Sequence, residues 1–282
     1  MQIVTEWLVD LHGRLDDEPV VDDVRVGVFY TAVRLSTRQV GVAFTPRELG
    51  DSVCCPKTAA AAPPAGQLIG TGAWELARYA ASPHPLWRSL GVATLNALSA
   101  LARASAGLPA GVLREDLDAL AAAAIAEDDR VVMVGAFLPF LKKLKHRVAA
   151  LGVIDRHRDA LKADEHALWV PPERAAAAVR RASVLVLTGS ALVEGGLEEL
   201  LTRAGGARLR IMAGPTTPLW PHPFFARGID VLGGLHVLDG PDLVTIVGEG
   251  GSGYLFEQVA RKACLLGPRV VERAREAGVA SR

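Results

Sequence analysis

Apolar residues in the first part of the chain alternate between helical spacing and short strand-like runs. Ile3, Trp7 and Leu11 recur at intervals of four, which places them on one face of a helix. Patterns of this kind predict helices at residues 2–15, 73–81, 86–106 and 116–126. Two valine-rich runs predict β-strands at residues 24–30 and 40–44. This part of the chain is therefore expected to form a small α+β domain.

The second half has a different pattern, in which short continuous apolar runs alternate with helical stretches. The apolar runs predict buried strands at residues 131–134, 149–154, 184–187, 209–212 and 229–232. Between them, helical patterns occur at residues 140–145, 173–181, 197–204 and 223–227. Strands separated by helices form right-handed βαβ units, so we predict an α/β domain with a parallel sheet covered on both faces. The expected division is one domain of residues 1–128 and a second of residues 129–282.

Composition and charge describe a folded protein and narrow the range of its partners. Of the 282 residues, 50% are hydrophobic and 22% are charged, which is typical of a chain with a sizeable core. The 31 Lys and Arg residues balance the 31 Asp and Glu residues, so no nucleic acid or membrane surface is expected as a partner. No apolar segment reaches about 18 residues, so no membrane-spanning helix is predicted. A homodimer is expected from base rates alone.

The cysteines bear on both the compartment and a metal site. Three cysteines cannot form a disulfide framework, and the amino terminus lacks the basic and apolar segments of a signal peptide, so a cytoplasmic protein is predicted. The adjacent Cys54 and Cys55 suit a soft metal ion of low coordination number better than tetrahedral zinc. The alternative is that both are small, half-buried residues of a loop. Cys264 lies in an apolar stretch interpreted as helical, and it is expected in the core.

Three predicted strands each run into a loop of small, hydroxyl-bearing or cyclic residues. The carboxyl ends of parallel strands form the ligand crevice of an open α/β sheet. Glycine in such a loop lets the backbone approach a ligand, and hydroxyl groups can donate to its oxygen atoms. The alternative is that the loops only connect strands to helices and cap them. The candidate ligand-binding residues are Gly135, Phe137, Pro139, Thr188, Gly189, Ser190, Gly214, Pro215 and Thr216.

A glycine-rich segment, residues 248–253, matches the spacing G-x-G-x-x-G of dinucleotide-binding loops. That fingerprint needs a further strand with an acidic residue about 20 positions later. Here residues 270–277 have the pattern of a charged helix, and the chain ends at Arg282. We therefore interpret the segment as a turn between helices that touches the crevice, and NAD is not expected as a cofactor.

Several of these segments, taken in order, resemble a known family. They are Val134-Gly135-Ala136-Phe137-Leu138-Pro139, Thr188-Gly189-Ser190-Ala191-Leu192-Val193-Glu194-Gly195, Gly214-Pro215-Thr216-Thr217-Pro218 and, nearer the amino terminus, Leu90-Gly91-Val92-Ala93-Thr94-Leu95-Asn96-Ala97. The chain resembles the bacterial and archaeal proteins described as heavy-metal chelation proteins, domains of unknown function 364 and 4213. This resemblance implies a Rossmann-like carboxyl-terminal domain, an amino-terminal domain similar to that of enolases, and a site between the two.

Two carboxylates are the candidate metal-binding side chains of this crevice. Asp155 follows the predicted strand at residues 149–154, where a metal or a cationic ligand group would meet it. Family members usually have Asn at the position of Glu194, so Glu194 adds negative charge that favours a cation, unless it caps the next helix. The leading hypothesis is binding of a metal ion of unspecified identity, or of a metal chelate. The alternatives are an enzyme acting on a small anionic metabolite at the same crevice, and a scaffold protein without a working site.

Overall fold

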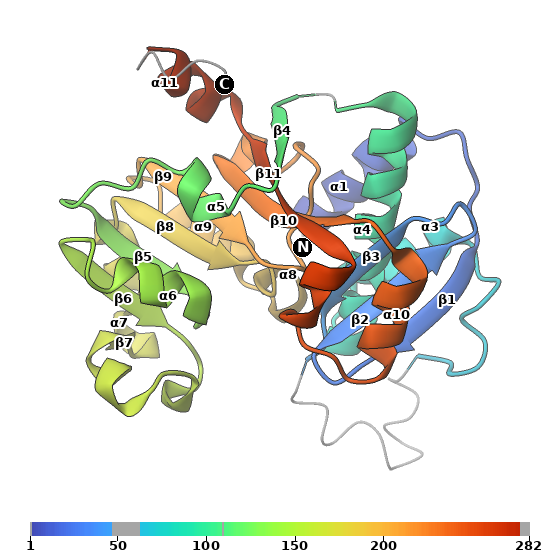
Figure 1. The fold of residues 1–282 in the computed structure, drawn as a ribbon, viewed down its shortest axis with the longest axis horizontal. Coiled ribbons are helices and arrows are strands. Elements are labelled where there is room, and N and C mark those ends of the chain that lie inside the picture. Colours follow the sequence, from blue (N-terminus) through green and yellow to red (C-terminus); the bar gives the residue numbers. More distant parts are fainter. Residues whose placement is uncertain (1, 47–62, 109, 277–282) are drawn as a thin grey trace.

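An eight-stranded sheet forms the centre of the molecule in this computed structural model, which describes residues 2–46, 63–108 and 110–276 (Figure 1). The strand order is β4 (Val112–Glu115), β11 (Ala260–Leu266), β10 (Val231–Val237), β9 (Leu209–Ala213), β8 (Val184–Thr188), β5 (Arg130–Val134), β6 (Ala150–Ile154) and β7 (Trp169–Val170). The strands from β10 to β7 are parallel, and β11 is antiparallel to both of its neighbours. The predicted α/β class with a largely parallel sheet is therefore confirmed.

Alternate residues of the central strands face two separate hydrophobic layers. Val132 and Leu185 belong to the core that contains residues of the helices behind the sheet, α7 (Pro172–Arg181), α8 (Ala191–Glu194) and α9 (Leu197–Arg203). Met133 and Val186 belong to the layer formed with α5 (Ala119–Ala122) and α6 (Leu138–Leu144). Because both faces are covered, these strands are apolar throughout, which is the pattern that the sequence showed. A last helix, α11 (Pro268–Glu276), follows β11.

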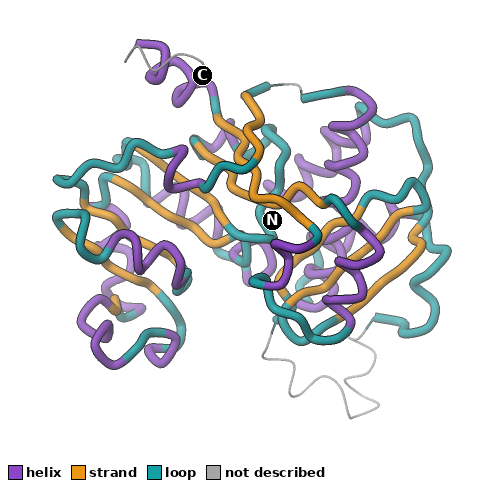
Figure 2. The backbone as a smooth tube through the Cα atoms, in the orientation of Figure 1, coloured by secondary structure: helices purple, strands orange, loops and turns teal. Residues whose placement is uncertain are grey.

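A second, three-stranded antiparallel sheet consists of β1 (Val21–Val26), β2 (Tyr30–Leu35) and β3 (Val40–Phe44), and Figure 2 shows its strands as a separate group. The long helix α4 (Pro85–Ala106) contacts β2 and β3, and α10 (Gly240–Gly248) contacts β1 and β2. Both contacts are close: a Cβ at Gly41 would collide with the Ala93 carbonyl, and a Cβ at Gly27 with that of Val247. A helix from the carboxyl-terminal half therefore completes the amino-terminal unit.

Two further helices and several single turns complete the described elements. The helices are α1 (Gln2–His12) and α3 (Ala73–Ala77). The turns of 3₁₀ helix are η1 (Arg78–Ala81), η2 (Arg158–Ala160), η3 (Ala163–Leu168), η4 (Phe225–Arg227) and η5 (Leu255–Gln258). Among the described residues, no helix is long and apolar enough to cross a membrane.

Four local expectations from the sequence are wrong. The run at residues 24–30 is not one strand, because the chain turns between β1 and β2. The helix expected at residues 116–126 is confined to α5 and follows β4, a strand that the sequence analysis missed. Residues 223–227 form only the turn η4. Cys264 lies in β11 rather than in a helix, and it is fully buried, as expected.

The amino-terminal helix and the segment after β9 join the two sheets. The Trp7 ring meets Phe224 edge to face with centroids 5.4 Å apart, and the Trp220 indole donates to Asp10 at 2.6 Å. The side chain of Arg227 donates to both carboxylate oxygens of Glu6, at 2.7 and 3.0 Å. Together with β4 and α10, these contacts cross the predicted boundary at residue 128, and the division into two domains stays a prediction.

Candidate functional site

A cavity of about 400 Å³ lies where the small sheet, the turn after α10 and the loops of the large sheet meet. We call it the aromatic cavity. Its walls include the loop after β5, the loop after β9 and the faces of β10 and β11. Seven aromatic side chains of the described residues line it: Phe29, Tyr30, Phe44, Phe137, Phe140, Tyr254 and Phe256. Such apolar walls suit an organic molecule, because a ligand pocket gains most of its affinity from buried apolar surface.

Charged side chains are few in this cavity. Among its described lining residues, two are acidic, Asp118 and Glu257, and Lys262 is the one cation. Lys262 lies 3.0 Å from Glu257, which neutralises it, and Lys143 lies 3.2 Å from Asp118. The lining therefore gives an anion no unpaired positive charge.

The loop after β5 is held in place by Asp155. One carboxylate oxygen of Asp155 accepts the Ala136 amide at 2.9 Å, and the other accepts the His157 amide at 3.0 Å. Gly135 has φ of +88°, and a Cβ there would collide with Thr188, so only glycine fits this turn. Asp155 is not among the residues that line the aromatic cavity; it fixes the loop that carries Phe137 into the wall.

The loop after β9 connects the two sheets directly. The Phe44 backbone amide donates to the Thr216 hydroxyl at 2.9 Å. The side-chain nitrogen of Asn96 donates to the Thr216 carbonyl at 3.0 Å and to that of Val42 at 2.9 Å. A Cβ at Gly189 would lie 2.6 Å from the Thr217 nitrogen, so this junction needs glycine. Thr216 and Gly189 therefore fix the position of the loop, while Gly214 and Pro215 line the cavity.

The loop after β8 leads to the other predicted carboxylate. Thr188 lies beside Gly135, and its hydroxyl accepts the Ser190 amide at 3.3 Å. The Ser190 hydroxyl lies 3.5 Å from a carboxylate oxygen of Glu194 at the exposed end of α8. Glu194 is the last residue of α8, and α9 begins at Leu197 with Gly196 as its N-cap.

The candidate residues thus divide into two groups. Phe137, Pro139, Gly214 and Pro215 line the aromatic cavity. Gly135, Thr188, Gly189, Ser190 and Thr216 lie in the same loops but outside its lining. Within residues 2–46, 63–108 and 110–276, no three His, Cys, Asp or Glu side chains gather as a metal site. Cys54 and Cys55 lie outside the described residues.

Several lining residues were not predicted from the sequence. Tyr30 and Phe44 belong to the small sheet, and Tyr254 and Phe256 follow the glycine-rich turn. A signal existed for the last two, because residues 248–253 were expected to touch the crevice, and Ser252 and Gly253 do line it. The turn follows the helix α10, so the strand that a dinucleotide fingerprint requires is not there.

Cys264 is no candidate nucleophile. Its thiol donates to the Leu117 carbonyl at 3.0 Å. Burial raises the pKa of Cys264 to about 12, with a smaller contribution from Asp118. The reactive thiolate is therefore not formed near neutral pH.

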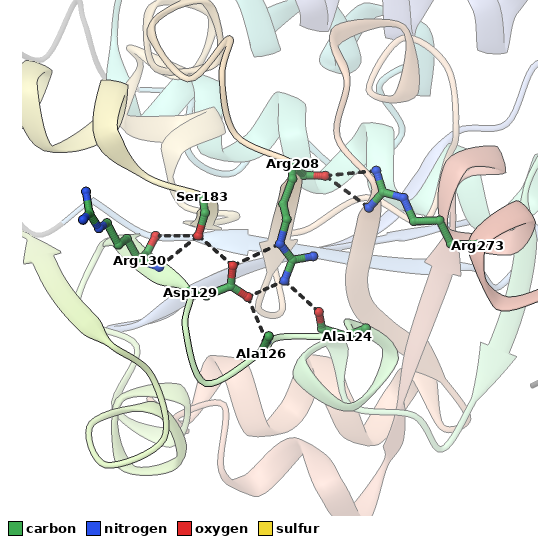
Figure 3. Close-up of polar contacts among 7 residues, drawn as sticks. All are labelled: Ala124, Ala126, Asp129, Arg130, Ser183, Arg208 and Arg273. Carbon is green, nitrogen blue, oxygen red and sulfur yellow. Dashed lines mark hydrogen bonds and ion pairs between the residues drawn. The ribbon is translucent and has the colours of Figure 1, made fainter. Parts of the chain in front are cut away.

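At the amino ends of the parallel strands, opposite the loops that line the aromatic cavity, a polar network surrounds Asp129 (Figure 3). Its carboxylate accepts hydrogen bonds from the Ser183 hydroxyl at 2.7 Å, the Ala126 amide at 2.8 Å and the Arg208 guanidinium. Burial raises the pKa of Asp129, but the hydrogen bonds from Arg208, Ser183 and Ala126 outweigh it, so the net pKa lies below the ordinary value. This network joins the amino ends of β5, β8 and β9.

Comparisons with known proteins agree on the family. The family model DUF364 matches residues 118–266 and DUF4213 matches residues 9–99; both are described as "Putative heavy-metal chelation". Two solved structures of DUF364 proteins of unknown function are similar, one from Pyrococcus horikoshii (20% identity, TM-score 0.71) and one from Desulfitobacterium hafniense DCB-2 (18%, 0.72). Each comparison covers 94% of this chain and 99% of the other. A search of curated proteins found no significant match.

Proposed function

This chain belongs to the DUF364 family, and from that membership we propose that it binds a metal carried by a small organic chelator, with the chelate in the aromatic cavity. The observation that carries the proposal is the lining of this cavity, where aromatic rings from four separate segments surround about 400 Å³. The expectation of a metal rests on the family description, and the expectation that the metal is bound as an organic chelate rests on the chemistry of the cavity walls.

A bare metal ion does not suit these walls. Soft ions select thiolates and thioethers, and harder ions select carboxylates or carbonyls, usually several at once. Aromatic rings provide none of these ligands, but they pack well against the flat frame of an organic chelator. A chelator also satisfies most of the metal's coordination positions before the protein is reached.

The charges of the lining favour a neutral or cationic complex. Each of the two lining carboxylates, Asp118 and Glu257, is paired with a lysine, so no unpaired positive charge remains among the described lining residues to hold an anionic complex. The alternative, an enzyme acting on a small anionic metabolite, would need unpaired cations or free amide groups at the ligand. No lining residue within the described part of the chain provides an unpaired cation, so the chelate is the better supported ligand of this cavity.

The test is a binding titration with the one-to-one complex of Zn²⁺ and phenanthroline, a flat cationic chelate. Zn²⁺ alone and phenanthroline alone are titrated in parallel. We expect the complex to bind, and Phe137→Ala to weaken its binding by about tenfold or more, because a half-buried aromatic wall is removed. Phe225→Ala, a half-buried phenylalanine outside this lining, is the matched control and leaves binding unchanged.

Two further variants separate the cavity from the other predicted metal ligands. Cys54→Ser combined with Cys55→Ser removes the soft ligands, and Glu194→Gln removes a carboxylate. The proposal expects the chelate to bind all of these variants as it binds the unaltered protein. The proposal would be overturned if Zn²⁺ bound as tightly without the chelator. In that case binding would be lost in the double cysteine variant or in Glu194→Gln, and Phe137→Ala would not change it.

A further inference from the structure

A second cavity, of about 410 Å³, lies beyond the loop that follows β9. We call it the arginine cavity. Pro215 of this loop lines the aromatic cavity, whereas Thr217 and Leu219 of the same loop line the arginine cavity. Its other walls include the turn between β2 and β3, one side of α4, Leu113 of β4, and β10 with the residues that follow it. Polar side chains lie on several of these walls, among them Arg38, Asn96 and Arg103.

The main feature of this cavity is a half-buried arginine without an acidic partner. Arg103 of α4 donates one hydrogen bond, from Nη1 to the Leu219 carbonyl at 2.9 Å. Within the described residues no carboxylate lies within ion-pair distance of it. Burial lowers the pKa of Arg103 to about 10, and no neighbouring charge opposes this shift. A guanidinium has five N–H donors, so most of its hydrogen-bonding capacity is left for a ligand.

Two more side chains that can donate hydrogen bonds line the same cavity, Arg38 and Thr217. Arg38 has φ of +76°, and its side chain is exposed and forms no ion pair within the described chain. The hydroxyl of Thr217, on the loop after β9, is buried without a hydrogen-bond partner among the described residues and can donate to a ligand oxygen. A buried polar group without a partner costs free energy unless a ligand or water satisfies it.

The carboxylates near this cavity already have partners. Glu115 lies 2.5 Å from the Nδ1 atom of His236, which lines the cavity. Asp239 accepts the Asp242 amide at 3.0 Å as the N-cap of α10. Neither carboxylate contacts Arg103, so the positive charge of this arginine remains available to a ligand.

We infer that the arginine cavity binds a small oxyanion, a phosphate or carboxylate group, with Arg103 as the inner contact and Arg38 at the mouth. A planar guanidinium binds two oxygens of such a group at once, which distinguishes it from a lysine. The volume also accommodates the organic part of a small phosphorylated or carboxylated molecule. This site is separate from the proposed chelate site and stands without it.

The test measures thermal unfolding in potassium phosphate and in potassium citrate, each compared with potassium chloride at equal ionic strength. For the unaltered protein we expect phosphate, citrate or both to raise Tm by about 2–3 °C at ten times Kd. A response to phosphate alone identifies a phosphate group, and a response to citrate alone identifies a carboxylate. Isothermal titration calorimetry with the same salts gives Kd directly.

Arg103→Met removes the charge while keeping much of the side-chain length. We expect this variant to lose the anion response, and Arg103→Lys to retain only part of it. The matched control is Arg88→Met, a half-buried arginine of the same helix that donates to the Val193 carbonyl at 2.5 Å. The control should lose stability in chloride but keep the full anion response.

The outcomes separate a ligand site from a merely structural arginine. If Arg103→Met does not fold, Arg38→Met is measured instead, with an expected weakening of anion binding of about fivefold. The inference is overturned if no anion raises Tm above the chloride value. It is overturned equally if Arg103→Met keeps the response of the unaltered protein.

Discussion

Carboxylates have different roles at the amino ends and at the carboxyl ends of the parallel strands. At the amino ends, Asp129 is 4% exposed and is paired with Ser183 and Arg208, whose strands follow directly. At the carboxyl ends, the carboxylate of Asp155 accepts the backbone amides of Ala136 and His157 and holds a loop at the rim of a cavity. At the amino ends the polar side chains bond to one another, whereas at the carboxyl ends the loops border a cavity with aromatic walls.

This difference separates what the fold needs from what a ligand needs. The network around Asp129 connects the starts of three strands, so its removal should affect stability without reshaping the aromatic cavity. The glycines at the other edge permit close packing of loops, so their replacement should affect the cavity more than the fold. In an α/β sheet the strand scaffold is rigid and the loops at its carboxyl edge provide the site.

The largest expected effect is on Asp129. Asp129→Ala leaves Arg208 and the Ala126 amide without their partner, and we expect a loss of about 2–3 kcal/mol in the free energy of unfolding. The value lies below that of a fully buried pair because the Arg208 side chain is 39% exposed. Denaturant unfolding measures it, with Asp128→Ala, an exposed neighbour, as a control within about 0.5 kcal/mol of the unaltered protein. If Asp129→Ala weakened chelate binding without a loss of stability, the Asp129 network would serve the ligand site rather than the fold.

A smaller effect is expected at the carboxyl edge. Gly189→Ala places a methyl group 2.6 Å from the Thr217 nitrogen, and we expect it to cost about 1–2 kcal/mol as the loop after β9 shifts. Because Gly214 and Pro215 move with this loop, chelate affinity should fall at the same time. Gly206→Ala, where a Cβ has open space, is the control. A stability loss with unchanged chelate affinity would show that the loop does not shape the cavity.

The smallest effect is the pH dependence of the Asp129 network. The pKa of Asp129 is lowered from its ordinary value of 3.8, so its contribution to stability is complete above about pH 5 and is lost as the pH falls through the lower, folded value. We therefore expect the stability difference between the unaltered protein and Asp129→Asn to be constant from pH 5 to 7 and to shrink below about pH 4. A constant difference down to pH 2 would show that the carboxylate is not stabilised in the folded state.

The strands of the large sheet were the part of the fold most visible in the sequence. β5, β6, β8, β9 and β10 are largely apolar, and the run is most continuous in β8, whose faces are both covered. β11 was missed because Arg261 and Lys262 interrupt its pattern, and Cys264 was taken for part of a helix. The helix expected at residues 116–126 rested on alanine propensity, and only α5 forms, because β4 and the turns around it occupy the flanking residues.

Only the wall of the aromatic cavity that the large sheet contributes could be predicted from the sequence. Phe137, Pro139, Gly214 and Pro215 were found because the ends of parallel strands converge at one edge of a sheet. Tyr30 and Phe44 come from another sheet, and their approach depends on how the two units pack, which no local pattern contains. Thr216 was chosen for its hydroxyl, but in the structure that hydroxyl accepts the Phe44 amide and fixes the loop.

The most direct test of the aromatic cavity is a crystal structure with the Zn²⁺–phenanthroline complex, with the metal located by anomalous scattering at the zinc edge. We expect an anomalous peak inside the aromatic cavity, between the loop of Phe137 and the turn of Tyr254, with phenanthroline density against the aromatic rings. A zinc peak on Asp155, Glu194 or the cysteines, with this cavity empty, would contradict it.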